Sequence, residues 1–219
     1  MEQQGLADSS DPQVSRQERR KIRTRKSLVD AARQLFLEKG VSATSVNDIT
    51  ETADVAYGTF YNYFTGVEDI VPLVARDELA GHLVRVRELR FGYDDPALVA
   101  ALNLRFTFVS VIEDPAMRWL SQRPSVMFEE LFDILSEDSA ATNISGVEAG
   151  RFNLRYSLEN LRVFVLWGLI GMWNKVWESP GSQAACLDDL TRMHLRLLGV
   201  DDDSIEQVIK TLPEVVPTS

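Results

Sequence analysis

The segment 45–64 constrains the fold of this chain more than any other part of the sequence. Ser45 followed by Asp48 three residues later is typical of a capped helix N-terminus, and the helix that follows is short. Asp54 tolerates a tight turn, and a third short helix is predicted over 57–64. Two short helices joined by a tight turn indicate a helix-turn-helix. The predicted core positions of these two helices are Val46, Ile49, Ala53, Phe60 and Phe64.

An amphipathic helix is predicted before this segment, and it carries much of the positive charge of the chain. It stops at Gly40, directly after a lysine in its last turn. Residues 14–39 hold nine basic and three acidic residues, a net charge of +6. The rest of the chain therefore has a net charge of −16, which gives −10 for the whole chain. A basic segment on an acidic body can bind phosphate locally. Its apolar stripe is Leu28, Ala31, Ala32, Leu35 and Phe36.

Beyond Gly66 the apolar pattern predicts longer helices and no alternating strand, so the expected fold class is all-α. Pro72 should bend the first of these helices, over 67–90. The chain divides into a disordered tail over 1–13, a helix-turn-helix DNA-binding domain with a basic arm over 14–66, and a helical ligand-binding and dimerisation domain over 67–219. The other expected helices cover 96–112, a short stretch between Pro115 and Pro124, 125–150, 157–177, 183–198 and 203–211.

The stretch 55–64 carries more polar aromatic groups than a packed helix needs. Two positions suffice for the core, yet three tyrosines, Thr59 and Asn62 occupy much of the rest. Tyrosine hydroxyls and short polar side chains suit phosphate oxygens and base edges, and a two-turn helix fits the major groove. The alternative is a solvent-exposed polar face with the tyrosines packed sideways. The basic segment upstream favours the groove-binding interpretation.

The residues from Arg23 to Ile70 resemble the DNA-binding domain of the tetracycline-repressor (TetR) family. The resemblance implies that Thr44, Tyr61 and Tyr63 contact phosphates, and that Tyr57 and Thr59 face bases. Gly58 would allow the helix start to approach the DNA backbone. The resemblance to the TetR family rests on Ala31-Ala32-x-x-Leu35-Phe36, Gly40, Thr44-Ser45-Val46-x-Asp48-Ile49, Ala53-x-Val55 and above all Gly58-Thr59-Phe60-Tyr61-Asn62-Tyr63-Phe64.

Three residues depart from the pattern of that family. Ala56 stands where a capping serine is usual, Asp54 replaces a turn glycine, and Val67 replaces a lysine that grips phosphate. The hypothesis is that the basic arm over 16–26 compensates for the lost lysine from a neighbouring groove. The predicted DNA-binding residues are Arg19, Arg20, Lys21, Arg23, Thr44, Ser45, Tyr57, Gly58, Thr59, Tyr61, Asn62 and Tyr63.

The helix over 157–177 is apolar on two sides, so both sides need a partner. One side can face its own core, while the other meets a second copy of the chain. Together with the helix over 183–198 it could form a two-fold four-helix interface, the arrangement of proteins it resembles. The expected partners are therefore a homodimer mate, double-stranded DNA with a palindromic operator, and a small apolar or aromatic effector. A purely internal helix is the alternative.

A ligand pocket is expected between the helices that follow residue 96, with an apolar wall and a few polar anchors. The alternative for its aromatic residues is ordinary core, and for Arg105 an acidic neighbour. The candidate lining residues are Asn103, Arg105, Phe106, Trp119, Met127, Phe128, Phe132, Phe164, Trp167 and Met172.

Enzymatic function is disfavoured. The two histidines, His82 and His194, lie on different helices without ligand-like spacing and are interpreted as surface or interface residues. No zinc pattern, nucleophile elbow or phosphate-binding loop occurs, so no metal, cofactor or catalytic residue is expected. One cysteine, no apolar leader and a longest charge-free apolar run of 11 residues predict a cytoplasmic protein without a membrane span. A helical DNA-binding adaptor without a small-molecule response remains the alternative to a ligand-controlled repressor.

Overall fold

The computed structural model describes residues 15–114, 117–179 and 181–213, and these form helices without any strand. The all-α prediction is confirmed, whereas the predicted disordered tail over 1–13 lies outside the described residues. The elements are α1 Arg16–Lys39, the 3-10 turn η1 Val41–Ala43, α2 Val46–Thr52, α3 Tyr57–Phe60, the 3-10 turn η2 Val67–Asp69, α4 Val71–Leu89, α5 Pro96–Glu113, α6 Met117–Ser121, α7 Pro124–Ile134, α8 Ser136–Glu148, α9 Leu158–Glu178, α10 Gln183–Leu197 and α11 Asp202–Thr211.

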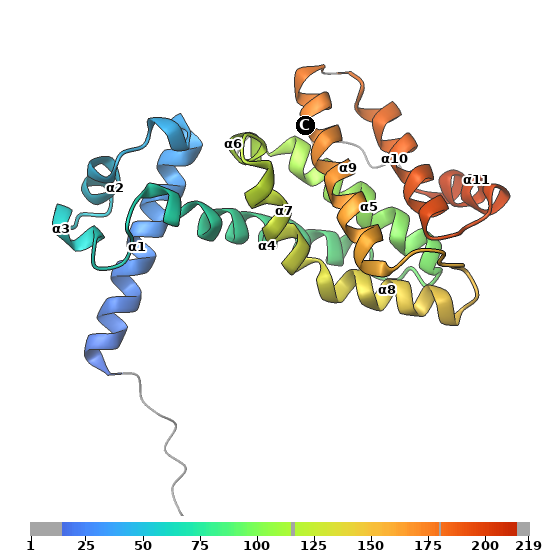
Figure 1. The fold of residues 1–219 in the computed structure, drawn as a ribbon, viewed down its shortest axis with the longest axis horizontal. Helices are drawn as coiled ribbons and strands as arrows, with labels where there is room; N and C mark the ends of the chain where they lie inside the picture. Colours follow the sequence, from blue (N-terminus) through green and yellow to red (C-terminus); the bar gives the residue numbers. More distant parts are fainter. Residues whose placement is uncertain (1–14, 115–116, 180, 214–219) are drawn as a thin grey trace, which may run out of the picture.

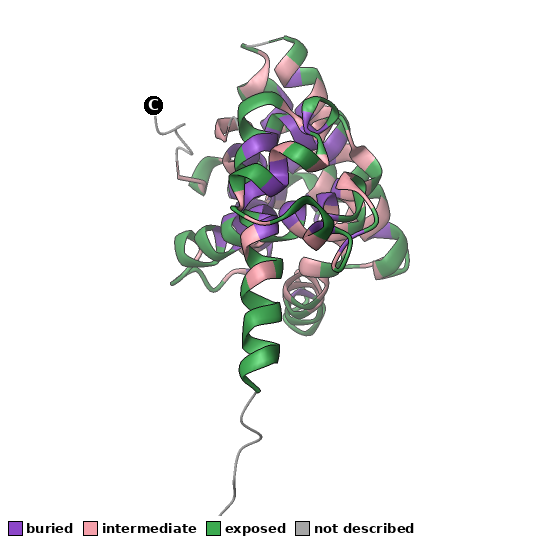
Figure 2. Ribbon diagram, turned by 90° about the vertical axis from the view of Figure 1, so that its left-hand side faces the viewer, coloured by how far each residue is buried: buried purple, intermediate pink, exposed green. Residues whose placement is uncertain are grey.

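The helices form a small group at one end of the molecule and a larger group at the other (Figure 1). We call residues 15–66, with α1, α2 and α3, the head, and residues 67–213 the body. Helix α4 runs from the head into the body, where α5 lies among α4, α8, α9 and α10. The first turns of α1 extend away from the rest of the molecule as an exposed helix (Figure 2).

Local sequence accounts for the start of α2 and for the turn after it. The Ser45 hydroxyl accepts a hydrogen bond from the Asp48 amide, and the Asp48 carboxylate accepts one from the Ser45 amide at 2.8 Å. This reciprocal capping box satisfies backbone amides that a helix start leaves unpaired, as predicted. Asp54 has φ 54°, a left-handed conformation that Asp tolerates better than most residues. The predicted tight turn between α2 and α3 is confirmed.

Three local predictions were wrong. The single helix expected over 125–150 is divided at Leu135 into α7 and α8. Helix α3 ends at Phe60, and residues 61–64 continue in turns, with the Tyr63 amide bonded to the Phe60 carbonyl at 2.9 Å. Pro72 does not bend a long helix, because it lies in the first turn of α4, after a separate 3-10 turn. A proline in the first turn costs no helical hydrogen bond, since that amide has no partner inside the helix.

One hydrophobic cluster runs through both head and body. It includes Leu28 and Phe36 of α1, Val74 of α4, and Trp173 of α9. The indole Nε1 of Trp173 donates to the Phe108 carbonyl at 3.0 Å, which satisfies its polar atom inside the core. The core therefore fixes the head to the body.

Helix α5 is long and apolar enough to cross a membrane, the single such helix in the described residues. In the structure, 61% of its apolar window is buried among the other helices. A central core helix of a helical protein has this composition for that reason.

Polar contacts between head and body supplement the shared core. Arg33 of α1 pairs with Glu78 of α4, and within the body Arg123 at the start of α7 pairs with Glu68, two residues after the end of the head, at 2.8 Å. The Trp119 ring of α6 packs against the Phe36 ring with centroids 5.5 Å apart. The head is thus held by α4 and by the α6–α7 segment as well.

Candidate nucleic-acid interface and effector cavity

Two tyrosine side chains project from the head at α3. Tyr57 and Tyr61 are about half exposed, and their hydroxyl groups lie 3.0 Å apart. Their rings meet edge to face with centroids 5.6 Å apart, so each restricts the other. The hydrogen bond to Tyr57 raises the pKa of Tyr61 above its ordinary value of 10.0. That bond uses one of the two hydroxyl hydrogens, so the pair retains one hydrogen and oxygen lone pairs for a further partner. The pair presents two adjacent hydroxyl groups to solvent.

The other predicted contacts of the head differ in accessibility. Gly58 and Asn62 are exposed, whereas Thr59 and Tyr63 are half-buried. Ser45 is exposed, but its hydroxyl is engaged in the cap of α2. A β-carbon added to Gly58 would meet nothing within 4 Å, so this glycine leaves open space at the start of α3.

Thr44 is the least accessible of the predicted head contacts. Its side chain is 8% exposed, and its hydroxyl donates to the Gly40 carbonyl at 2.8 Å. The hydroxyl hydrogen is therefore used inside the head. The hydroxyl oxygen of Thr44 can still accept a hydrogen bond from a further partner.

The first turns of α1 form a basic surface, which we define as Arg16, Arg19, Arg20, Lys21 and Arg23. All five are exposed. None makes an ion pair with any residue in the described ranges, unlike Lys26, which pairs with Asp30, and Lys39, which pairs with Asp48. Unpaired cations on a projecting helix are available to an external polyanion.

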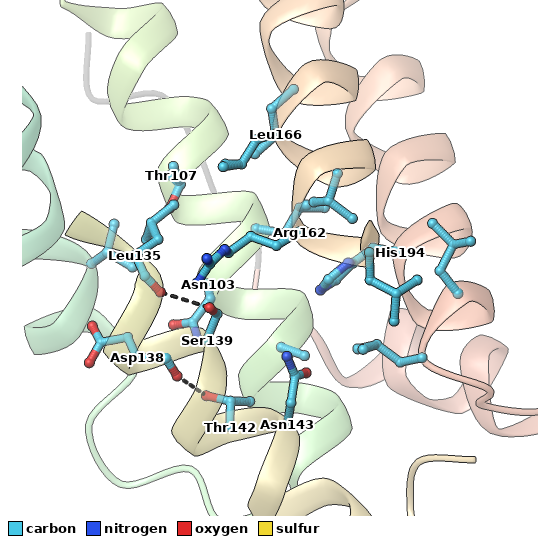
Figure 3. Close-up of a pocket in the computed structure, with 18 of the residues that line it drawn as sticks. Asn103, Thr107, Leu135, Asp138, Ser139, Thr142, Asn143, Arg162, Leu166 and His194 are labelled. Carbon is cyan, nitrogen blue, oxygen red and sulfur yellow. Dashed lines mark hydrogen bonds between the residues drawn. The ribbon is translucent and has the colours of Figure 1, made fainter. Parts of the chain in front are cut away.

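The body contains a cavity of about 110 Å³ lined by residues of α4, α5, α8, α9 and α10. Its wall is mostly aliphatic and includes Leu83, Leu166 and Leu169. Polar groups lie on one part of the wall (Figure 3). They are Asn103, Thr107, Asp138, Ser139, Thr142, Asn143, Arg162 and His194.

Of the ten residues predicted to line a pocket, Asn103 is the one that lies in the wall of this cavity. Arg105 pairs with Asp188 at 2.7 Å, which is the alternative the sequence left open. The remaining eight lie in the core or on the outer faces of helices, because the aromatic rings among them either pack against other side chains or are exposed to solvent. These eight are Phe106, Trp119, Met127, Phe128, Phe132, Phe164, Trp167 and Met172.

Two cavity residues, Arg162 and His194, were missed by the sequence analysis. Arg162 extends from α9 toward Asn103, and the His194 ring points into the same space from α10 (Figure 3). Burial lowers the pKa of His194 to about 4, so its ring is neutral at pH 7. The sequence signal that could have identified both residues is a charged or polar side chain on an otherwise apolar helix face.

The surface interpretation of His82 was wrong. Its side chain is 2% exposed, with Nε2 3.2 Å from Asp114 and Nδ1 2.6 Å from Arg85. Desolvation by burial lowers its pKa. Within the described parts of the chain, no group of three or more His, Cys, Asp or Glu residues could hold a metal ion.

The outer face of α9 is apolar. Phe164 is 64% and Trp167 is 44% exposed, and Trp167 stacks on Phe128 of α7 with centroids 4.9 Å apart. Gly168 and Gly171 lie beside them, and an added β-carbon at either would meet nothing within 4 Å. Large apolar side chains next to glycines form a surface that a second helix could approach closely.

Known proteins share this arrangement. The family model for bacterial regulatory proteins of the tetR family matches residues 28–72. The HTH-type transcriptional repressor KstR2 of Rhodococcus jostii is 35% identical over 184 residues, which cover 80% of this chain and 88% of that protein. The crystal structure of RolR in complex with resorcinol superposes with a TM-score of 0.78 at 27% identity, covering 90% of this chain and 99% of RolR. The repressor DhaR of a Mycobacterium species is 48% identical over 44 residues, which cover 20% of this chain and 22% of DhaR.

Proposed function

The chain belongs to the tetR family of bacterial regulatory proteins and is a DNA-binding transcriptional regulator, not an enzyme. We propose that it is a repressor that binds a palindromic operator as a homodimer and leaves it when a small effector enters the body. In this proposal residues 14–66 bind DNA, and residues 67–219 bind the effector and form the dimer. The relatives named as repressors support the negative sign of regulation.

The observation that carries the proposal is the paired hydroxyl groups of Tyr57 and Tyr61 on the exposed side of α3. The paired hydroxyl groups, 3.0 Å apart, retain one donor hydrogen and acceptor lone pairs that can bond to phosphate oxygens or base edges. The four residues of α3 and the turns after it would lie against the major groove. Gly58, which has open space around it, would face the DNA backbone.

The basic surface of α1 would bind phosphates outside the groove that α3 occupies. Val67 lacks the charge that the family pattern places at the start of the body. The five exposed cations of the basic surface supply charge from a different direction, because they extend away from α2 and α3 (Figure 1). This arrangement supports the hypothesis that the arm replaces the lost lysine.

The apolar outer face of α9 supports a homodimer through α9 and α10. Those two helices pack against one another, and Phe164 and Trp167 point away from the core of their own chain. A symmetric pairing would bury both rings and bring four helices together. Replacement of Trp167 by glutamate should yield a monomer in sedimentation analysis and should weaken operator binding with it.

The cavity supports control by a small molecule. Its volume of about 110 Å³ is on the scale of an engineered cavity of about 150 Å³ that binds benzene in another protein. RolR, which superposes over most of both chains, was solved with resorcinol. We infer that the effector of this chain is likewise a small compound, of the size of a single aromatic ring.

Selection of DNA from a random duplex pool by the purified protein tests the DNA-binding proposal. The expected product is a two-fold symmetric site. Tyr57→Ala and Tyr61→Ala should each weaken binding to that site by about 10-fold or more, as expected for loss of a hydrogen bond to a charged phosphate. Tyr156→Ala, an exposed tyrosine of the body, is the matched control. Unchanged affinity of both head variants would refute the assignment of α3 as the DNA-reading helix.

A further inference from the structure

Arg162 and His194 each bring a buried nitrogen without a partner to the cavity. The Nε of Arg162 and the Nδ1 of His194 have no hydrogen-bond partner among the described residues. The two side chains come from α9 and α10 and point into the same space (Figure 3). Arg162 can only donate, and a neutral histidine ring can carry its hydrogen on Nδ1. Since most buried polar atoms in proteins have a partner, these two nitrogens indicate a ligand that accepts hydrogen bonds.

The positive charge of Arg162 is not balanced within the cavity wall. Asp138 is the one carboxylate among the described residues of that wall, and it already pairs with Arg87 at 2.6 Å and with Arg90 at 3.6 Å. Arg162 forms no ion pair in the described ranges, and its guanidinium lies over the Phe132 ring, 3.6 Å from the centroid. The ring holds the guanidinium in place but carries no negative charge. The polar side of the cavity therefore has an excess of positive charge.

The hydrogen-bonding groups of the wall also favour a ligand that accepts. The Ser139 and Thr142 hydroxyls use their hydrogens on backbone carbonyl oxygens one turn earlier, at 2.7 and 3.0 Å (Figure 3). The Asn103 carbonyl oxygen already accepts a hydrogen bond at 3.3 Å, so its amide hydrogens remain for another partner. Burial alone lowers the pKa of His194 to about 4, without an acidic neighbour that would favour the charged ring. Donors from Asn103, Arg162 and His194 thus face the cavity together.

We propose that the cavity binds an organic monocarboxylate, with its carboxylate group on Arg162 and His194 and its apolar part against the aliphatic wall. An ionised carboxylate has two accepting oxygens and no hydrogen to donate, and its charge offsets that of Arg162. The cavity is partly open to solvent, so the charged ligand has a route into it.

The size of the cavity limits the apolar part of this ligand. The volume of about 110 Å³ suits a single ring or a chain of similar size. Leu166 and Leu169 belong to the aliphatic wall that this part would contact. The inference rests on the effector cavity of the proposed function and names the chemical class of the effector.

The experiment compares each acid with its own amide, which has nearly the same shape but no charge. The pairs are benzoate with benzamide and hexanoate with hexanamide, titrated into the full chain without DNA at pH 7 and followed by calorimetry. At least one acid should bind about 10-fold or more tightly than its amide, as expected for a hydrogen-bonded ion pair. A smaller preference in both pairs, or a preference for the amides, would overturn the proposal.

Variants of the two anchors test which side chains hold the carboxylate. Arg162→Met should weaken binding of the preferred acid about 10-fold or more and change binding of its amide by less than about twofold. Arg162→Lys retains the positive charge and should recover part of the lost affinity for the acid. His194→Leu should weaken binding of the acid about fivefold. Arg155→Met, on an exposed arginine before α9, is the matched control and should bind both compounds as the original protein does.

Two results with Arg162→Met would overturn the assignment of this anchor. One is a preference for the acid that survives the substitution. The other is an equal loss of affinity for the acid and the amide, which would indicate that Arg162 only maintains the shape of the cavity.

These outcomes are separable from the test of the proposed function. DNA selection contains no added compound, so a symmetric operator together with no preference for either acid would overturn the ligand class alone. Loss of DNA selection with an intact preference for the acid would overturn the DNA-reading role of the head alone.

Discussion

Replacement of Arg19, Arg20 and Lys21 by glutamine tests whether the first turns of α1 hold DNA phosphates. All three are exposed, and none has an ion pair in the ranges that the structure describes, so the change breaks no such contact. Each phosphate contact contributes about 0.9 to the slope of log affinity against log salt concentration. Three lost contacts should therefore reduce the slope by about 2.7 per subunit.

Fluorescence anisotropy with a labelled operator, measured from about 50 to 200 mM KCl, resolves this change. Over that fourfold range, the slope difference of about 2.7 alters the relative affinity by about 40-fold for each subunit, which is about 1,800-fold for a dimer. Glutamine at Arg118, Arg155 and Lys210, three exposed cations of the body, is the control with the same change in net charge. An unchanged slope in the α1 variant, or an equal change in the control, would refute a direct role for the basic surface.

Three further predictions concern stability. Burial lowers the pKa of His194 from 6.5 to about 4, so the unfolded chain binds a proton at this residue more readily than the folded chain does. The free energy of unfolding should therefore fall as the pH drops from about 6.5 toward 4. In urea titrations His194→Gln should lose less unfolding free energy over this range than the original protein, by at most about 3 kcal/mol. Arg33→Ala leaves Glu78, 7% exposed, without this partner and should lower the free energy of unfolding by about 1–3 kcal/mol; Lys26→Ala, from an exposed pair, should cost well under 1 kcal/mol, and equal losses would contradict the reasoning. Ser45→Ala removes the hydroxyl that accepts from the Asp48 amide and should cost about 1 kcal/mol in a thermal melt followed by circular dichroism, an expectation that an unchanged melting temperature would rule out.

The helical head could be predicted closely because local rules decide it. The capping box at Ser45 and the left-handed Asp54 depend on residues a few positions apart. The end of α3 and the place of Pro72 were less predictable. Apolar spacing continues through both boundaries, so periodicity does not distinguish an α-helix from a run of 3-10 turns.

The cavity could not be placed from the sequence, because aromatic residues at helical spacing fit a pocket, a core and an outer face equally well. Packing decided among these: Phe128 stacks on Trp167 near the surface, and Trp119 packs on Phe36. The cavity formed instead among smaller aliphatic side chains. Of the two polar anchors predicted, Asn103 lies in the cavity wall, whereas Arg105 pairs with Asp188. A polar residue on an apolar helix therefore needs a partner, but the sequence does not say whether that partner is a side chain or a ligand.

The contact of Trp119 with Phe36 has a consequence for chimeric regulators. A head grafted onto the body of another regulator would bring half of this aromatic contact and half of the ion pair between Arg33 and Glu78. Unless the recipient body supplies matching side chains, the graft would leave an aromatic ring and a charge without their partners at the interface between head and body. Exchange of operator specificity between such proteins should therefore succeed more often when α4 and α6 are transplanted along with the DNA-reading helices.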